Sequence, residues 1–390
     1  MPTDTSLSEA GIRLLPESPK DGITSLCYLD INTDDSSSSL LASTSWDGCL
    51  RIHDTGAENS GDSSSKLATL QNMESGPLLA LSKYNNPDTK KVYVYTGGLD
   101  GSIKRFDIDT SQVATVGYVP LSENENEEDT STDAACSCLN VIKTNNADAG
   151  DHIIASAGWN SKFYLWDVAN LDENGEGRVR DPIFTLSLPD KAFSMDVDPS
   201  NSSRIAISTA GRKLIIIDID ASDPSKPMAK IVLQRESSLK FQSRICRFFP
   251  TGIGLAIGSI EGRVAIEFLA ELDVSPPEKM KKYAFKCHRK DNIVYPVNAI
   301  AFHPSYGTFA TGGCDGTVVT WDGLHKKKLV VLPKFPQGIA ALAFNGDGSE
   351  LAIASSYTFE EGDKGNGEDD VHEIYVKKII DSEVRPKGSK

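Results

Sequence analysis

GCDGTVVTWD, which runs from Gly313 to Asp322, is the stretch of sequence that decides the fold. Its Asp315–Gly316 pair stands between two mainly apolar runs and favours a tight hairpin turn, because glycine tolerates a positive φ. After the turn, residues 317–322 alternate between the two sides of an extended chain. The stretch therefore predicts two antiparallel strands joined by a short turn.

The same pattern recurs along the chain, at SWDGCLRIHD (Ser45–Asp54), GLDGSIKRFD (Gly98–Asp107), GWNSKFYLWD (Gly158–Asp167), TAGRKLIIID (Thr209–Asp218) and SIEGRVAIEF (Ser259–Phe268). Most copies place Asp or Asn in the turn and close with Asp. The last of these five departs from that pattern, since Glu261 opens it and Phe268 closes it. Repetition at roughly fifty residues is typical of propeller blades with four strands each.

A seventh unit follows the last turn. Gly338–Phe344 and Glu350–Ser355 are predicted strands joined by a turn at Asn345–Gly348, and His372–Ile379 supplies a third. We expect Gly11–Leu15 to complete this blade and close the ring, which removes exposed sheet edges. The fold class is therefore all-β, a seven-bladed WD-repeat β-propeller, with six or eight blades as alternatives.

The expected domain organisation is a single propeller over residues 11–380. Residues 1–10 are expected to be a flexible N-terminus and residues 381–390 a C-terminal tail. Acidic loop insertions are expected near 55–66, 121–133 and 360–370, because these polar stretches cannot bury enough apolar surface to pack.

Composition excludes several kinds of protein. The net charge is -15, which disfavours direct nucleic-acid binding. The seven cysteines are scattered and form no paired metal-ligand motif, so we expect reduced thiols and no metal or other cofactor. The sequence shows no signal peptide and no apolar run of about 18 residues, so no membrane association is expected.

Motifs of catalysis are not apparent. The sequence lacks a GxSxG elbow, an HExxH helix and a phosphate-binding GxxxxGK[ST] loop. Cys287 and His288 are adjacent, but neighbouring residues of a strand point to opposite faces and do not pair readily. We therefore expect a binding protein and no enzyme.

The aligned turns indicate a binding face. The residue just before the first residue of the turn is Trp46 in the first repeat and Trp159 in the third. The residue two positions after the first residue of the turn is Lys162, Lys213 and Arg263 in the third, fourth and fifth repeats. Equivalent turns ring one face of a propeller, and tryptophan and arginine are frequent anchors of protein interfaces. The alternatives are packing of the tryptophans between blades and simple solvation of the charges.

Two basic segments stand out in this acidic chain. QRESSLKFQSR contains Arg235, Lys240 and Arg244, and KKYAFKCHRK (residues 281–290) contains five further cations. Alternation in Tyr283–Cys287 predicts a strand. Charges gathered in this way can converge on an acidic or phosphorylated ligand.

A resemblance to a known family lies in the motifs RESSLKFQSR, GSIEGRVAIEF, KKYAFKCHR, YPVNAIAFHP, TFATGGCDG and LAIASSYTFEEGD. Together they resemble the mitotic spindle-checkpoint WD-repeat adaptors, the family of the third "budding uninhibited by benzimidazoles" protein. The resemblance covers essentially the whole chain and is densest from Arg235 to Asp363. It implies a non-catalytic, seven-bladed adaptor in the nucleus and cytoplasm and at the kinetochores of mitotic chromosomes.

The resemblance also implies ligands and site residues. Such adaptors bind the acidic GLEBS segment of Bub/Mad-type checkpoint kinases or pseudokinases, and the pair then recognises threonine-phosphorylated MELT motifs on a kinetochore scaffold. GLEBS binding is expected at Trp46 and Arg244, to which the aligned turns add Trp159 and Lys213. The phosphothreonine is expected at Arg263 and Lys286.

Two other classes remain as alternatives. The sister family of WD-repeat mRNA-export factors, which bind a nucleoporin GLEBS segment, shares the SIEGRVAI and FKCHR motifs, but Ser237–Leu239 lacks the proline expected there. A ubiquitin-ligase substrate receptor is disfavoured because neither Trp166–Asp167 nor Trp321–Asp322 is followed by the arginine that such receptors carry; ubiquitin binding is open but unsupported. A monomer is expected, since a closed propeller offers no free edge.

Overall fold

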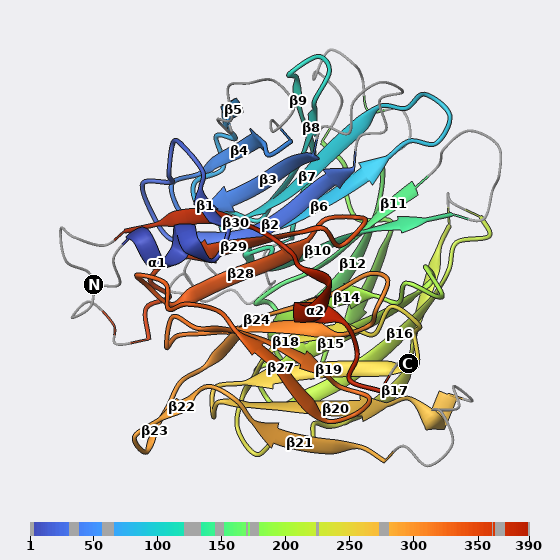
Figure 1. Ribbon diagram of the computed structural model, residues 1–390. Coiled ribbons are helices and arrows are strands. Elements are labelled where there is room, and N and C mark those ends of the chain that lie inside the picture. The colour runs from blue at the N-terminus through green and yellow to red at the C-terminus, as the bar shows by residue number, and fades with distance from the viewer. Residues whose placement is uncertain are drawn as a thin grey trace.

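The computed structural model describes residues 4–30, 39–56, 66–120, 134–144, 152–168, 171, 179–223, 226–272, 281–360, 362 and 371–388. Seven four-stranded antiparallel sheets surround a common axis (Figure 1). The first strands of successive blades contact one another, and that of the seventh blade contacts that of the first. The prediction of a seven-bladed all-β propeller is confirmed.

The strands follow the chain blade by blade. The first blade is β2 (Ile23–Asp30), β3 (Ser39–Ser45), β4 (Cys49–Asp54) and β5 (Lys66–Asn72). The second blade is β6 (Leu78–Asn85), β7 (Val92–Gly98), β8 (Ser102–Asp107) and β9 (Val113–Tyr118). The third blade is β10 (Cys138–Lys143), β11 (His152–Ala157), β12 (Lys162–Asp167) and β13 (Phe184–Ser187). The fourth blade is β14 (Ala192–Val197), β15 (Arg204–Thr209), β16 (Lys213–Asp220) and β17 (Met228–Glu236).

The fifth blade is β18 (Ser243–Phe248), β19 (Gly254–Ser259), β20 (Arg263–Phe268) and β21 (Tyr283–Lys286), with the short helix η2 (Ala270–Leu272) after β20. The hairpin β22 (Arg289–Lys290) and β23 (Ile293–Val294) leads to the sixth blade, β24 (Val297–Phe302), β25 (Phe309–Gly313), β26 (Val318–Asp322) and β27 (Lys327–Val331). The seventh is β28 (Ile339–Phe344), β29 (Glu350–Ser355), β30 (Glu373–Lys378) and β1 (Ile12–Leu14).

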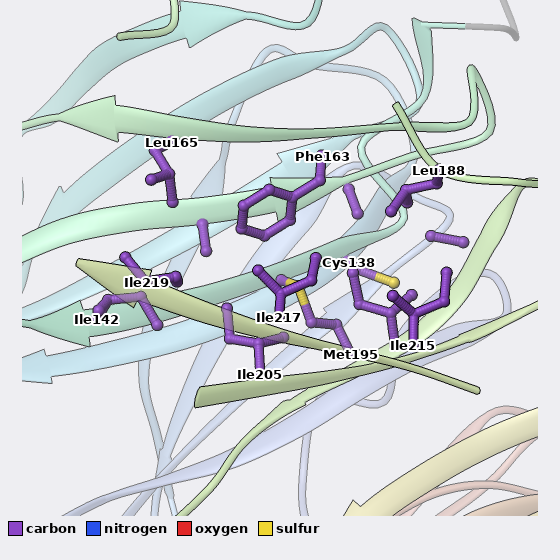
Figure 2. Packing of buried hydrophobic residues seen from close by; sticks show 14 of the residues in the cluster. Cys138, Ile142, Phe163, Leu165, Leu188, Met195, Ile205, Ile215, Ile217 and Ile219 are labelled. Atoms are coloured by element: carbon purple, nitrogen blue, oxygen red, sulfur yellow. The ribbon is translucent and has the colours of Figure 1, made fainter. Parts of the chain in front are cut away.

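Apolar side chains fill the space between neighbouring blades. Figure 2 shows the cluster between the third and fourth blades, where Phe163 and Leu165 of β12 face Ile205, Ile215 and Ile217 of β15 and β16. Each of these five side chains is completely buried. Full burial of such a side chain stabilises the fold by about 1.5–3 kcal/mol, so the contacts between blades hold the ring together.

The N-terminal segment closes the ring. β1 pairs antiparallel with β30, with Ile12 opposite Lys377 and Leu14 opposite Tyr375. The N–H of Leu15 donates to the carbonyl of Ile374 over 2.8 Å. The prediction that Gly11–Leu15 completes the last blade is therefore confirmed.

Both chain ends are more ordered in the structure than the sequence suggested. Residues 4–9, within the segment expected to be flexible, form helix α1 (Asp4–Glu9) with Leu7 buried. Residues 381–384 of the expected tail form helix α2 (Asp381–Val384) with Val384 buried. Of the three acidic insertions, residues 57–65, 121–133, 361 and 363–370 lie outside the described residues.

One buried lysine connects the two chain ends. The side chain of Lys377 in β30 is only 2% exposed and forms an ion pair with Glu383 of α2 at 3.0 Å. Its Nζ also donates to the carbonyl of Ala10, after α1, over 3.1 Å. The cost of burying this ammonium is thus offset by a carboxylate and by backbone oxygen atoms.

The structure also shows the state of the cysteines and the character of the helices. All seven cysteines are free thiols, and burial raises the pKa of Cys138 to about 12 and that of Cys246 to about 11. Within the described ranges, His, Cys, Asp and Glu form no cluster suited to a metal ion. In the same part of the chain, no helix has the length and apolar character needed to cross a membrane.

We predict that Lys377→Ala lowers the free energy of unfolding by about 3 kcal/mol, because it leaves the partly buried Glu383 without its cation. Urea unfolding followed by intrinsic fluorescence measures the loss. Lys378→Ala, at the adjacent exposed position of the same strand, is the matched control and should change stability by less than about 0.5 kcal/mol. Equal effects of the two substitutions would contradict this assignment.

Candidate functional site

A repeated hydrogen bond fixes the turns on one face of the ring. The N–H of Trp46 donates to the carbonyl of Gly22, just before the first strand of its own blade, over 2.8 Å. The equivalent donors of the other blades are Leu99, Trp159, Ala210, Ile260, Cys314 and Ser356, at 2.8–3.3 Å from their acceptors. The turns that the sequence alignment placed together therefore occupy equivalent positions in space.

A second repeated feature is a β-bulge near the start of the first strand. In six blades the pairing of the first strand with the second skips one residue: Thr24, Leu79, Phe193, Arg244, Asn298 and Ala340. A bulge bends the strand and redirects the side chain of the extra residue. In the third blade, Ser137 precedes β10 and occupies the corresponding position.

These seven residues line a depression of about 630 Å³ at the mouth of the central channel. Its rim adds Trp46, Trp159, Tyr357, Phe359 and His372. Trp46 is 41% exposed and Phe359 is 54% exposed, so aromatic surface faces the solvent there. We refer to this site as the hub depression.

The hub depression brings together three of the residues predicted from sequence, namely Trp46, Trp159 and Arg244. The exposed indole of Trp46 is inconsistent with simple packing of that residue between blades. The Arg244 side chain is exposed, and among the described residues no carboxylate forms an ion pair with it. An exposed arginine surrounded by aromatic side chains suits a ligand with both carboxylates and apolar groups.

Sequence reasoning missed several lining residues, including Phe193, Asn298, Tyr357 and Phe359. Phe193 and Asn298 are bulge residues, whose orientation depends on strand register. Tyr357 and Phe359 follow the last repeat, in the segment YTF after β29. Their presence in the motif LAIASSYTFEEGD, directly after a buried strand, was the signal that could have drawn attention to them.

Lys213 lies outside the hub depression. It begins β16 and pairs directly with Glu236 of β17, with an ion pair of 3.1 Å between Nζ and the carboxylate. Arg212 contacts the same carboxylate at 3.2 Å. The hydrogen bond and charge of Lys213, together with Arg212, hold the pKa of Glu236 below its usual value.

Arg263 and Lys286 are directly opposite each other on β20 and β21, so their side chains leave the same face of the sheet. Arg263 Nε lies 3.4 Å from a carboxylate oxygen of Glu261. Two other cations border this glutamate: Arg289 donates to its carbonyl over 2.7 Å, and the N–H of Lys240 donates to its carboxylate over 3.2 Å. Three basic residues thus contact the carboxylate or the backbone of Glu261, and the fourth, Lys286, lies opposite Arg263. We call these four residues the fifth-blade cations.

The turn that presents Trp46 is held by Asp47. Its carboxylate accepts hydrogen bonds from Arg51 (2.7 Å) and from the N–H groups of Lys20 and Cys49 (3.0 Å each). Burial alone would raise the pKa of Asp47, but these hydrogen bonds and that of Ser45 lower it to about 2. Gly22 leaves room beside the indole, since a Cβ there would lie 3.3 Å from Trp46 Cδ1.

His288 has a structural environment. Its two ring nitrogens lie 2.9 Å from Asp315 Oδ1 and 2.9 Å from Thr311 Oγ1, and the indole N–H of Trp321 donates to the same Thr311 oxygen over 2.9 Å. Burial raises the pKa of the neighbouring Cys287 thiol to about 12. Both nitrogens of His288 are thus engaged by residues other than Cys287, and burial favours the protonated form of the thiol.

Comparisons with known proteins agree with this architecture. The model of the WD40 family, "WD domain, G-beta repeat", matches residues 12–54 and 280–322. The mitotic checkpoint protein bub3 of Dictyostelium discoideum is 36% identical over 370 residues, which cover 93% of this chain and 94% of that protein. The mitotic checkpoint protein BUB3.1 of Arabidopsis thaliana is 44% identical over 238 residues, 60% of this chain and 64% of that protein.

Fold and site together define a WD-repeat β-propeller with an aromatic and basic face at the channel mouth. The chain belongs to the bub3 family of mitotic checkpoint WD-repeat proteins. A poly(A)+ RNA export protein of Schizosaccharomyces pombe is also similar, with 32% identity over 377 residues that cover 95% of this chain and 92% of that protein.

We predict that Asp47→Asn lowers the free energy of unfolding by about 1–2 kcal/mol at neutral pH. The depressed pKa of Asp47 means that its contribution is present above the ordinary value of 3.8 and is lost as the pH falls toward about 2. The stability difference between native protein and variant should therefore shrink below about pH 4 in denaturant titrations.

Asp100→Asn is the matched control for this experiment. Asp100 occupies the same turn position in the second blade and accepts a hydrogen bond from the N–H of Ser102, at 2.9 Å, but is not paired with an arginine among the described residues. A difference between the native protein and Asp47→Asn that stays constant from pH 7 to pH 2 would show that this carboxylate does not act through its charge.

Proposed function

We propose that this protein is a non-catalytic spindle-assembly-checkpoint adaptor. It binds the GLEBS segment of Bub/Mad-type checkpoint proteins in the hub depression and recruits them to threonine-phosphorylated MELT motifs of a kinetochore scaffold. The observation that carries the proposal is the convergence of Trp46, Trp159 and Arg244 on one depression, on the face of the ring whose turns also lead to Arg263 and its cross-strand partner Lys286. The names of the bub3 relatives support the checkpoint role.

The hub depression suits an acidic peptide that also carries apolar side chains. Trp46 and Phe359 offer exposed aromatic surface, which gains free energy when a ligand covers it. Arg244 can form a bidentate hydrogen bond with a carboxylate of the ligand. No ion pair has to be broken first, because Arg244 forms none among the described residues. Such a charged hydrogen bond contributes about 1.5–3 kcal/mol.

The fifth-blade cations suit a phosphate group. Phosphothreonine carries a charge of about -1.5 to -2 and three acceptor oxygens. Arg263 can bind two of these oxygens, while Lys286, directly across the strand pair, adds a second positive charge. The 3.4 Å contact between Arg263 and Glu261 is long for an ion pair, so a dianion can replace it.

The proposed role also implies where in the cell the protein works. The proposed adaptor works in the nucleus and cytoplasm and at kinetochores, as a monomer that contacts protein ligands and no nucleic acid directly. Its net charge of -15 disfavours binding to DNA or RNA.

A WD-repeat mRNA-export factor that binds a nucleoporin GLEBS segment is the second candidate. The similarity to the RNA export protein of Schizosaccharomyces pombe supports it. Both candidates use the hub depression for an acidic segment. They differ at the fifth-blade cations, which only the checkpoint adaptor uses for phosphothreonine.

We predict that a phosphothreonine MELT peptide binds the protein–GLEBS complex at least about tenfold more tightly than the unphosphorylated peptide, and that Arg263→Ala abolishes this gain. Fluorescence anisotropy measures both affinities. Lys162→Ala, at the equivalent position of the third blade, is the control and should preserve the gain. If the GLEBS peptide binds but the phosphorylated and unphosphorylated MELT peptides have the same affinity, the result would favour the export factor.

We also predict that Arg244→Ala weakens GLEBS binding at least about tenfold, because carboxylates of the segment lose their cation. Isothermal titration calorimetry with a GLEBS peptide measures the effect. Lys213→Ala should weaken binding by about twofold or less, since Glu236 already holds that lysine. Unchanged affinity for Arg244→Ala would mean that the hub depression is not the GLEBS site.

A further inference from the structure

The fourth repeat differs from most of the others at one position of the turn that faces the hub depression. In four of the six repeats the second residue of this turn is a glycine with a φ of 63–81°: Gly48, Gly101, Gly262 and Gly316. The fourth repeat places Arg212 there, with a φ of 64°. A left-handed backbone is disfavoured for a residue with a Cβ, so Arg212 is held in this conformation at an energetic cost.

The Arg212 side chain holds residues 237–242, which connect the fourth blade to the fifth and which we call the blade connector. Its Nη1 donates to the carbonyl of Leu239 over 3.1 Å, and its own carbonyl accepts from the N–H of Ser237 over 2.8 Å. Arg212 also forms an ion pair with Glu236, a carboxylate that is 56% exposed. Exposed ion pairs contribute little, so the bond to Leu239 matters more for local order.

The fifth blade holds the blade connector from the other side. The N–H of Ser238 donates to the carboxylate of Glu267 over 2.7 Å, and the N–H of Lys240 donates to the carboxylate of Glu261 over 3.2 Å. Glu267 is fully buried and forms an ion pair with Arg235 at 3.0 Å. Its carboxylate is therefore an acceptor with a fixed position.

One peptide group of the blade connector is bound from both blades. The carbonyl of Leu239 accepts from Arg212, and the N–H of the same peptide group, which belongs to Lys240, donates to Glu261. The Leu239 side chain is 2% exposed and packs in the cluster between the two blades. The plane of this peptide group is thus fixed, and Phe241 follows it directly in the chain.

The blade connector borders the hub depression. The carbonyl of Gln242 accepts the N–H of Ile260 over 3.1 Å, in the repeated hydrogen bond whose acceptor in the first blade is Gly22. Phe241 therefore corresponds to Asp21, which lines the hub depression. The Phe241 side chain is 54% exposed, so it offers a further aromatic surface where the fourth and fifth blades meet.

We propose that Arg212 is a positioning residue of the hub depression, which fixes the blade connector so that Phe241 meets an acidic, partly apolar peptide in one orientation. This inference rests on the proposed function, because it takes the GLEBS segment as that peptide. Arg212 acts through the blade connector and does not contact the ligand. A peptide that meets an ordered connector loses less conformational entropy on binding.

Arg212→Gly tests this role, because glycine is the common residue at this turn position and tolerates the left-handed backbone. We expect the variant to bind a GLEBS peptide about fivefold more weakly in isothermal titration calorimetry. Ser161→Gly is the matched control, since Ser161 occupies the same turn position in the third blade with a φ of 58°. It should leave the affinity within about twofold.

Hydrogen exchange of the protein without ligand measures the order of the blade connector directly. Peptides that cover residues 237–242 should exchange faster in Arg212→Gly than in the native protein, because one of their hydrogen bonds is lost. Peptides that cover β2 in the first blade should exchange at the same rate in both proteins. Mass spectrometry of peptic fragments provides both measurements.

A double variant separates positioning from direct contact with the ligand. If Arg212 acts through Phe241, adding Arg212→Gly to Phe241→Ala should weaken GLEBS binding by less than about twofold beyond the loss caused by Phe241→Ala. Two groups that contact the ligand independently would give additive losses.

Four results would each overturn the inference: equal GLEBS affinity of the native protein and Arg212→Gly, an equal loss in Ser161→Gly, additive losses in the double variant, or unchanged exchange of the blade connector. A GLEBS peptide that fails to bind the native protein overturns the proposed function and this inference with it. Equal binding to the native protein and Arg212→Gly overturns this inference alone.

Discussion

The pairing of β1 with β30 is the interaction on which the rest of the structure depends. Each blade buries both faces against its neighbours, so an open ring would expose two apolar faces to water. β1 reaches the seventh blade from the opposite end of the chain, and Lys377 joins α1 and α2 at the same place. The hub depression takes a residue from every blade, so its shape exists only when the ring is closed.

Recognition in this propeller rests on a backbone irregularity that is repeated around the ring. Six first strands carry a bulge, and each directs one side chain towards the channel mouth. The strands behind the bulge keep their pairing whatever that side chain is. The side chain at the bulge can therefore be basic, as in Arg244, or aromatic, as in Phe193. Where it is polar it also bonds to the next blade, since the hydroxyl of Thr24 donates to the carbonyl of Leu78 over 2.8 Å.

The sequence predicted the blades because turn chemistry and strand alternation are local properties. The same alignment grouped Trp46 with Trp159, and the structure places both on one depression with Arg244. These local patterns do not predict the register of strand pairing or which residues tertiary contacts bury. Phe193 and Asn298 were missed because a bulge decides where they point, and the pairing of Lys213 with Glu236 depends on the register between β16 and β17. Helices α1 and α2 form because Leu7 and Val384 are buried against the folded ring, a context that the terminal segments alone do not reveal.

The uneven distribution of charge has a consequence for the kinetics of encounter. Cations gather on the fifth and sixth blades of a molecule whose total charge is -15, so its charge is unevenly distributed over the surface. A negatively charged molecule that diffuses nearby is repelled by the net charge and is reoriented towards one flank before contact. The Debye length is about 8 Å at physiological ionic strength, so this guidance acts over the final approach and fades as salt increases. The charge distribution thus influences the direction from which ligands approach, in addition to the chemical groups that bind.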